Sequence, residues 1–277
     1  MRILKGEAVA LGELIFVGLG LHDEKGISLQ GIEEVRSADA VFAEFYTSLM
    51  AGLSVKELEK LVGKKISVVS RQALEEEKGQ LILQSAKKGK VALLVPGDPL
   101  IATTHVDLRI RAEKHGIKTR VVHGASIISA VIGLSGLQNY KYGRSVTIPF
   151  SDETFAPETP YKVIAENKKM GLHTLCFLDI KAEEKRYMTI KEGLQQLLAM
   201  EKRRRQGAVT LDTLVLGIAR AGSREPTVKA GYVKEILNHD FGTPPHCLVF
   251  LGKLHFMEAE ALITLAKAPE KIRETVK

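Results

Sequence analysis

The chain lacks several residue types and spacings that would mark particular protein classes. Its 277 residues include 2 cysteines and no tryptophan, and aromatic residues make up 5%. So few aromatic side chains argue against platforms on which nucleic-acid bases stack. There is no Cys-x-x-Cys or His-x-x-x-His spacing, so we expect no metal. Cys176 and Cys247 lie in apolar, strand-like runs, which favours buried reduced thiols over a disulfide.

Long apolar runs are also missing. A membrane-spanning helix needs about 18 consecutive apolar residues, and the longest runs here have the length of a strand. Lys5, Glu7 and Glu13 interrupt the N-terminus before the core of a signal peptide could form. We therefore expect a globular protein with a cytoplasmic location and no membrane partner.

The excess of positive charge is modest. The chain has 40 basic and 33 acidic residues and a net charge of +7, which favours an acidic macromolecular partner. The charges are not concentrated, so direct nucleic-acid binding is not expected. The one dense basic cluster is Lys202–Arg205, between a helical pattern and the next strand. We expect a solvated loop there, with contact to a partner protein or its bound RNA as the alternative.

The length and the apolar content of 45% fit two domains. From Leu14 onward strand and helix patterns alternate, which predicts a largely parallel sheet in the first half. Ser28 and Ser54 are expected to open two of the helices. The strands of this half are expected at residues 14–21, 40–44, 65–70, 91–95 and 119–123.

A glycine-bounded polar stretch at residues 136–144 has the composition of a linker, and we place a domain boundary near Tyr140. The predicted organisation is an N-terminal extension of residues 1–13 without an assigned role, an α/β domain of residues 14–140, and a mixed α/β domain of residues 141–277. In the second domain, strands are expected at residues 145–149, 174–180, 213–219, 228–232 and 247–251, and helices at residues 161–170, 190–203 and 258–266.

The most informative segment is Val91–His105, in which an apolar strand leads through a turn with two prolines into a helix. Open parallel sheets bind ligands just beyond the carboxyl ends of their strands. Gly97 permits close approach of a ligand there, and Asp98 places a carboxylate at the strand tip. Thr103 or Thr104 is expected to cap the next helix. Taken alone, the segment is also typical of a simple turn followed by a helix cap.

The first strand ends in Gly18-Leu-Gly20-Leu, which allows a ligand to lie against the backbone. A dinucleotide-binding fingerprint would need a third glycine at the position of Asp23, so that interpretation is weakened. A plain turn at the strand end is the alternative.

The fifth strand leads into Gly124-Ala-Ser126-Ile-Ile128, which invites comparison with the Gly-x-Ser-x-Gly nucleophile elbow of hydrolases. Ile128 stands in place of the second glycine, and a β-branched side chain obstructs the sharp turn that such an elbow needs. Ser126 is therefore expected to cap a helix, with its hydroxyl and backbone N–H available to a ligand.

Three residues of the second half lie near the ends of predicted strands. Leu178 and Ala221 are apolar or small residues suited to lining a ligand slot, and His246 stands at a strand entrance after two prolines. A buried, hydrogen-bonded histidine is the alternative for His246. The charged residues nearby are expected to belong to surface ion pairs: Asp179, Lys181 and Arg220.

Taken together, these stretches resemble the diphthine synthase family, whose members share their fold with the tetrapyrrole methylases. The resemblance is strongest in Pro-Gly-Asp-Pro-Leu-Ile-Ala-Thr-Thr-His at residues 96–105, and it extends in order and at compatible spacing from Leu14 to Pro269. Thr243 stands where the family's Phe-Gly-Asp-Pro-Pro motif has an aspartate. The resemblance implies two α/β domains of the tetrapyrrole methylase type, with the cofactor in the cleft between them.

The family methylates the 3-amino-3-carboxypropyl group attached to one histidine of translation elongation factor 2, a step towards diphthamide. The resemblance thus implies S-adenosyl-L-methionine as cofactor, S-adenosyl-L-homocysteine as product, elongation factor 2 as partner and a homodimer. An in-line displacement of this kind needs neither a metal nor a covalent intermediate. The sequence singles out no general base. Carried over by motif, the expected cofactor-binding residues are Leu21, Asp98, Ile101, Ser126, Ile127, Leu178, Ala221 and His246.

Four other functions remain open at this point. The nearest is a tetrapyrrole methylase of the same fold. A nicotinamide dehydrogenase would depend on Gly18 and Gly20, and a serine hydrolase on Ser126. A non-catalytic binding module of the translation apparatus would bind the elongation factor without consuming cofactor. The number of methyl groups transferred, and whether an amine or a carboxylate accepts them, also stay open.

Overall fold

The structure is a computed structural model that describes residues 12–151 and 156–276, apart from the side chain of residue 275. The chain divides into two compact units, one of residues 1–47 and 52–125 and the other of residues 48–51 and 126–277. Most of the predicted N-terminal extension, residues 1–11, lies outside the described residues.

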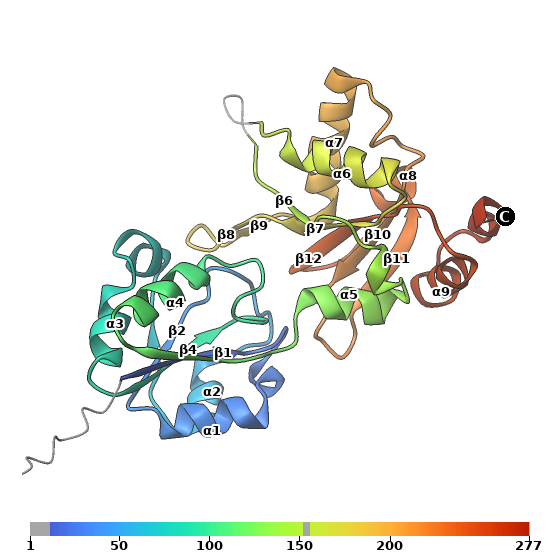
Figure 1. Cartoon of the computed structure of the whole chain (residues 1–277). Coiled ribbons are helices and arrows are strands. Elements are labelled where there is room, and N and C mark those ends of the chain that lie inside the picture. The colour runs from blue at the N-terminus through green and yellow to red at the C-terminus, as the bar shows by residue number, and fades with distance from the viewer. Residues whose placement is uncertain (1–11, 152–155, 277) are drawn as a thin grey trace, which may run out of the picture. The chain divides into compact units, whose positions relative to one another are not determined.

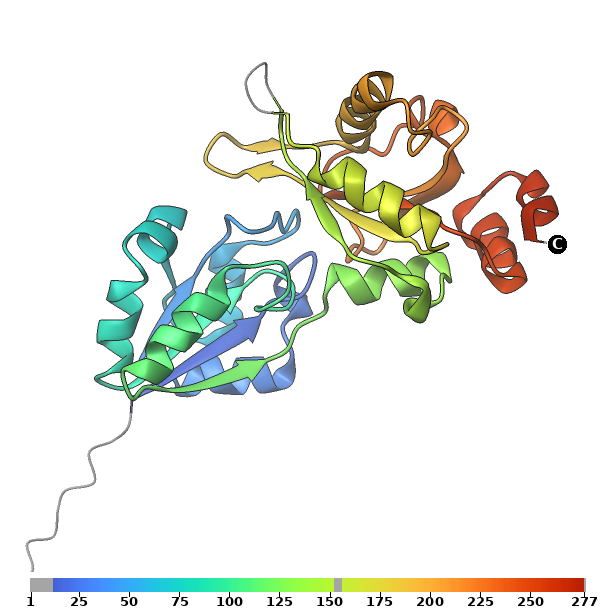
Figure 2. The ribbon, with the colours of Figure 1, turned by 45° about the horizontal axis from the view of Figure 1, so that its top comes forward.

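The first unit is a parallel sheet with helices on both faces. Its strand order is β3-β2-β4-β1-β5, and all its strand pairs are parallel. Helices α1 and α2 cover one face and α3 and α4 the other (Figures 1 and 2). The strands are β1 (Glu13–Gly18), β2 (Ala40–Ala43), β3 (Ser67–Val68), β4 (Lys90–Val95) and β5 (Lys118–Val122), and the helices are α1 (Leu29–Ser37), α2 (Val55–Val62), α3 (Gln80–Ala86) and α4 (His105–Lys114).

The central strands β1 and β4 are continuous apolar runs because both of their faces are covered. Residues 14–17 of β1 and 92–95 of β4 are fully buried. On the α3 and α4 side, Phe16 and Leu93 pack with Leu83 and Leu108. As predicted, Ser28 and Ser54 cap α1 and α2 by accepting hydrogen bonds from backbone N–H groups of the first turn.

The second unit has a mixed sheet in the order β11-β10-β12-β7-β6, in which only β6 and β7 pair in parallel. Its strands are β6 (Val146–Ile148), β7 (Thr174–Leu178), β10 (Leu214–Ala219), β11 (Thr227–Tyr232) and β12 (His246–Phe250), and a small hairpin consists of β8 (Ile180–Lys181) and β9 (Arg186–Tyr187). Its helices are α5 (Ile127–Ser135), α6 (Thr159–Lys169), α7 (Ile190–Arg204), α8 (Val233–Ile236) and α9 (Phe256–Ala266), followed by a 3-10 segment, Glu270–Val276.

Alternate residues of β12 enter two separate cores, as the two-residue repeat of a strand requires. Leu248 packs with residues of α6 and α7 on one face, and Val249 packs with residues of α5 and α9 on the other. The predicted α/β class, with a parallel first sheet and a mixed second domain, is confirmed. Because α5 packs within this second core, the main part of the second unit begins at Ser126, whereas the boundary predicted near Tyr140 follows α5.

Cys176 on β7 and Cys247 on β12 are free and buried, as predicted. Burial raises the pKa of both thiols, to about 12 for Cys247. Neither thiol is therefore ionised at neutral pH, and a redox or nucleophilic role is not supported.

The predicted cap of α4 is wrong. Thr104 holds the cap position with φ −89° and ψ 0°, and its side chain accepts no hydrogen bond from the helix. A capping side chain needs extended backbone at that residue. The Thr104 hydroxyl instead bonds to Glu75 Oε1 at 3.1 Å, and the Thr103 hydroxyl donates to Pro99 O at 2.9 Å.

The basic cluster Lys202–Arg205 is also not a loop. Helix α7 continues through Arg204, and Arg205 is its left-handed C-cap with φ 53°. Cations in the last turn of a helix interact favourably with the negative end of its dipole, which explains why the helix extends through the cluster. Arg204 in addition forms an ion pair with Glu158.

Candidate functional site

Four glycines meet where β1, β4 and β5 reach the carboxyl edge of the first sheet. A Cβ atom on Gly18 would lie 2.5 Å from Gly124 N and 2.6 Å from Gly97 O, and neither backbone atom could move away easily. Gly97 N donates to Gly20 O at 2.6 Å, and Gly20 N donates to Gly97 O at 3.2 Å. The glycines therefore let neighbouring turns pack backbone against backbone. This close backbone packing is sufficient to explain why glycine stands at position 18, and a bound dinucleotide is not needed to explain it.

Asp98 follows this junction and joins two of the turns. His123, directly after β5, donates from Nδ1 to Asp98 Oδ2 over 2.7 Å, while Leu100 N donates to Asp98 Oδ1 over 3.3 Å. The Asp98 side chain is 10% exposed and the His123 side chain 79% exposed. Sequence reasoning had singled out Asp98 but not His123.

Leu21 and Ile101 lie on the turns that follow β1 and β4. Leu21 is half-buried, and Ile101 is 38% exposed although it is apolar. Because Gly20 and Gly97 pair across these turns, the two predicted residues and Asp98 occupy adjoining loops of the first unit. An exposed isoleucine beside a carboxylate suits a ligand with apolar and polar parts.

Ser126 and Ile127 open α5 in the second unit. Ser126 is the N-cap, and its Oγ accepts from Ile128 N at 3.2 Å, as predicted. Ile127 is partly buried against the core that includes Val131. Among the described residues, no histidine hydrogen-bonds to Ser126, so the serine-hydrolase alternative has no base to activate this hydroxyl.

In the second unit, the strand register brings Leu178, Ala221 and His246 to one edge of the sheet. Strand β12 runs antiparallel to both β7 and β10, and Ala219 lies opposite His246. The ends of β7 and β10 therefore meet the first residue of β12. Leu178 is buried in the core, and Ala221 is half-buried.

His246 combines a bonded and an unbonded ring nitrogen. Ile190 N donates to His246 Nδ1 over 3.4 Å, which leaves the proton of the neutral ring on Nε2. Burial lowers the pKa of His246, so the ring is neutral at pH 7. Nε2 is buried without a hydrogen-bond partner in the described part of the chain. An unpaired buried donor costs about 1–3 kcal/mol, so this nitrogen is suited to a polar ligand atom.

The prediction of a surface ion pair for Arg220 is wrong. Its Nη1 donates to the carbonyl oxygens of Phe241 (2.8 Å) and Thr243 (2.5 Å), and its Nη2 donates to Thr227 Oγ1 (2.7 Å). The loop before His246 folds back over the end of β10 and offers carbonyl groups to the guanidinium. Ser223, on the same turn as Arg220, has a buried hydroxyl that is unpaired among the described residues.

Asp179 also forms no ion pair with another described residue. It accepts from Phe150 N at 2.8 Å and Ile180 N at 2.9 Å, so backbone N–H groups take the place of a cation where β7 ends. Lys181 does form the predicted kind of pair, with Glu184 at 3.3 Å.

Sequence reasoning missed a buried pair beyond β2. Glu44 is fully buried, and its Oε1 lies 3.1 Å from His105 Nε2. Glu44 also accepts from the backbone N–H groups of Tyr46 and Thr47. Burial, and then the charge of Glu44, raise the pKa of Tyr46. The strand-tip argument used for Asp98 could have found Glu44, because it is the last residue of the strand predicted at residues 40–44 and directly follows the observed β2.

Within residues 12–151 and 156–276, no group of three or more His, Cys, Asp or Glu side chains is arranged to hold a metal ion. In the same part of the chain, no helix is both long and apolar enough to span a membrane. The site residues offer close backbone approach, one carboxylate and unpaired N–H and O–H groups. These features suit binding and orientation of a polar ligand with apolar parts.

The comparisons with known proteins agree with one another. The family model described as Tetrapyrrole (Corrin/Porphyrin) Methylases matches residues 13–237. A diphthine synthase of Methanosarcina acetivorans is 52% identical over 266 residues, covering 94% of this chain and 98% of the relative. One of Methanothermobacter thermautotrophicus is 46% identical over 261 residues, covering 94% and 98%.

Solved structures give the same result. A crystal structure of a diphthine synthase superposes with a TM-score of 0.87 at 43% identity and covers 95% of this chain and all (100%) of its own. That of a putative diphthine synthase from Entamoeba histolytica has a TM-score of 0.84 at 39% identity, with coverage of 93% and 100%.

Proposed function

Because this chain belongs to the tetrapyrrole methylase family and, within it, to the diphthine synthases, we propose that it methylates the 3-amino-3-carboxypropyl-histidine of translation elongation factor 2. It is an S-adenosylmethionine-dependent methyltransferase of diphthamide biosynthesis. The choice of substrate rests on one observation: over nearly its full length, the chain has a sequence identity of 50–52% with diphthine synthases.

The chemistry that we propose is an in-line displacement. When bound, S-adenosylmethionine supplies a methyl group on a positively charged sulfur, which is already activated for transfer. The nucleophile must approach opposite the sulfur after losing its proton, and the protein's contribution is to align the groups and exclude water. A site made of turns fits this task, because it needs neither a covalent nucleophile nor a metal.

The candidate residues have the chemical groups needed to bind S-adenosylmethionine, the methyl donor. His246 Nε2 and Ser223 Oγ are buried polar atoms without a hydrogen-bond partner among the described residues, and each can hydrogen-bond to a polar ligand atom. Asp98 offers a carboxylate held by His123. We propose that the donor is bound by Leu21, Asp98, Ile101, Ser126, Ile127, Leu178, Ala221 and His246. That these residues lie around one cleft between the two domains remains a prediction.

We also propose a cytoplasmic homodimer, as the family resemblance implies. A monomeric profile in analytical ultracentrifugation would contradict the dimer. The tetrapyrrole alternative rests on the description of the family model alone, whereas the full-length relatives at 46–52% identity are diphthine synthases.

The direct test is mass spectrometry of elongation factor 2 that already carries the aminocarboxypropyl group. After incubation with this protein and S-adenosylmethionine, the modified histidine peptide should gain mass in whole methyl increments. Their number and position would show how many groups are added and which atom accepts them. A porphyrinoid offered in place of the factor should remain unmethylated. Methylation of the porphyrinoid alone would support the alternative.

A further inference from the structure

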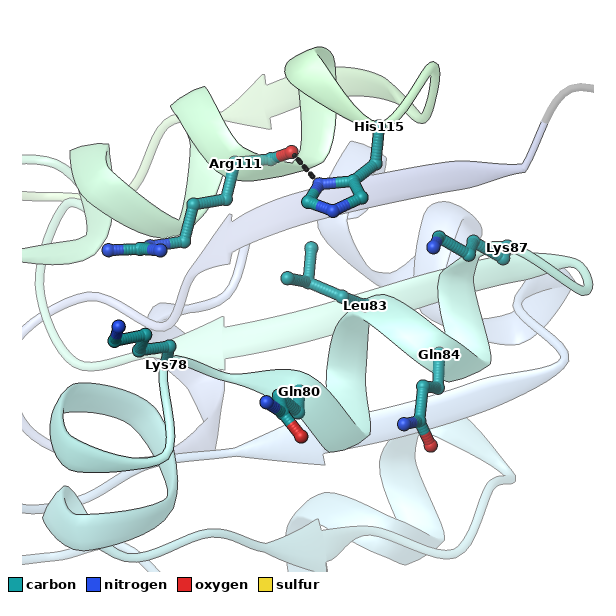
Figure 3. A pocket seen from close by; sticks show the side chains of 7 residues that line it. All are labelled: Lys78, Gln80, Leu83, Gln84, Lys87, Arg111 and His115. Atoms are coloured by element: carbon teal, nitrogen blue, oxygen red, sulfur yellow. Dashed lines mark hydrogen bonds between the residues drawn. The ribbon is translucent and has the colours of Figure 1, made fainter.

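A recess lies between α3 and α4 of the first unit, and none of the proposed donor-binding residues lines it. Its volume is about 310 Å³, which is at the lower end of the range of small-ligand sites. Figure 3 shows Leu83 in the middle, Lys78 and Arg111 at one end, and Lys87 and His115 at the other. The lining residues are Lys78, Gln80, Leu83, Gln84, Lys87, Arg111 and His115.

Two helix faces form the recess. Gln80, Leu83, Gln84 and the C-cap Lys87 stand at positions i, i+3, i+4 and i+7 along α3. Arg111 and the C-cap His115 are one turn apart along α4, so each set lies on one face of its helix. Leu83 is 8% exposed and belongs to the core between the two helices. The floor is therefore fixed by packing, while longer polar side chains form the rim.

The lining side chains carry positive charge without a carboxylate among them. Lys78 and Lys87 make no side-chain hydrogen bond or ion pair to another described residue. Arg111 donates from Nε to Asp107 at 2.6 Å, and its two Nη groups have no partner among the described residues. Cations gathered in a recess repel one another unless an anion joins them.

Two neutral amides supplement these charges. His115 Nδ1 donates its proton to Arg111 O over 2.7 Å, which orients the ring and leaves Nε2 of the neutral ring as an acceptor (Figure 3). The side-chain amides of Gln80 and Gln84 make no hydrogen bond within the described chain and can turn towards a ligand. A small anion with several oxygen atoms could use ammonium, guanidinium and amide donors together.

We propose that this recess binds a phosphate group carried by a small molecule. Guanidinium and ammonium groups are the usual protein partners of phosphate oxygens. The volume admits a pyrophosphate or the phosphate end of a nucleotide. The proposal is independent of methyl transfer, because no residue of the recess belongs to the proposed donor site.

The test is isothermal titration calorimetry of the full chain with inorganic pyrophosphate and, separately, with adenosine monophosphate at one fixed ionic strength. The variant is Lys78→Ala with Lys87→Ala. Its matched control is Lys88→Ala with Lys114→Ala, which removes the same charge from exposed positions next to the same helices but outside the lining. Urea unfolding of all three proteins verifies that they are folded.

We expect saturable binding by the unaltered chain, weakened about tenfold in the first variant and changed less than about twofold in the control. If the nucleotide binds more strongly than pyrophosphate, the nucleoside contributes to binding. If the two bind equally, the recess recognises the phosphate group alone. Equal weakening in both variants would overturn the proposal, since it would indicate a general charge effect. Binding to single-stranded RNA without binding to either small molecule would also overturn it.

Discussion

Asp98 and His123 are hydrogen-bonded over 2.7 Å although β4 and β5 are not neighbours in the sheet. Strand β1 lies between them, and its end is occupied by glycine, so no side chain separates the turns on either side. The carboxylate that the sequence indicated as a ligand-binding group is thus held in place by an exposed imidazole.

Replacing Asp98 by Ala should weaken binding of S-adenosylhomocysteine by about tenfold to a hundredfold, because charge-assisted hydrogen bonds contribute about 1.5–3 kcal/mol each. Calorimetric titration of the variant measures this. His123→Ala is the second variant, with which Asp98→Ala is compared. If Asp98 contacts the ligand itself, His123→Ala should weaken binding much less than Asp98→Ala. Equal losses would mean that Asp98 acts through the turn alone, and wild-type affinity in Asp98→Ala would refute both roles.

Gly18→Ala should lower the free energy of unfolding by about 1–3 kcal/mol, because the new Cβ would meet backbone atoms of two other turns. Binding of S-adenosylhomocysteine should weaken as well, since those turns carry Asp98. Gly133→Ala is the matched control. Gly133 lies within α5, no described atom outside its own helix backbone lies within 4 Å of the position of a new Cβ, and the change should stabilise by about 0.5–1 kcal/mol. Urea unfolding of both variants measures these changes in the free energy of unfolding. A Gly18→Ala protein as stable as wild type would show that the turns can separate at little cost.

Arg220→Lys should weaken S-adenosylhomocysteine binding about threefold to tenfold while barely changing the unfolding midpoint. A lysine cannot donate simultaneously to Phe241 O, Thr243 O and Thr227 Oγ1, so the loop that precedes His246 loses its anchor. Arg224→Lys, an exposed change on the same connection, should leave the affinity unaltered. If both variants bind equally well, the loop does not position His246 for the ligand.

Features that depend on a few adjacent residues could be predicted from the sequence. The helix caps at Ser28, Ser54 and Ser126 follow from a hydroxyl that precedes a helical pattern, and the buried thiols from apolar surroundings. The cap of α4 was predicted wrongly because Thr104 adopts ψ near 0°, a property that its residue type does not determine.

Contacts that depend on strand order or on the path of a loop could not be predicted in this way. The pairing of Glu44 with His105 joins residues far apart in the chain and needs β2 to lie beside β4. The contacts of Arg220 require a loop whose return path is not encoded in any short pattern. In both cases a charged residue was visible in the sequence, but its partner was not.

Glu258, at the start of α9, is fully buried and has four hydrogen-bonding or ion-pair partners in the second unit. His173 Nε2 lies 3.0 Å from its Oε1, Gln138 N donates at 2.9 Å and His255 N at 2.8 Å, and Lys141 Nζ forms an ion pair with it. Burial raises the pKa of Glu258, but the hydrogen bonds from His173 and Lys141 outweigh it and hold the pKa at about 2, below the ordinary 4.5.

Because the folded-state pKa is lowered, the unfolded chain binds the proton first as the pH falls. The stabilisation is therefore complete above about pH 4.5 and is lost as the pH falls towards about 2. Glu258→Gln should lower the free energy of unfolding by about 3 kcal/mol at neutral pH. The deficit relative to wild type should shrink as the pH falls through that window.

Urea unfolding at several pH values measures this difference, with Glu260→Gln as the control on the same helix. Glu260 is half exposed and pairs with Arg273 at 2.8 Å, so its loss should cost no more than about 1 kcal/mol. A deficit for Glu258→Gln that stays constant from neutral to acidic pH would contradict the electrostatic explanation, because lost packing does not titrate. A deficit no larger than that of Glu260→Gln would show that burial of the charge cancels what its hydrogen bonds contribute.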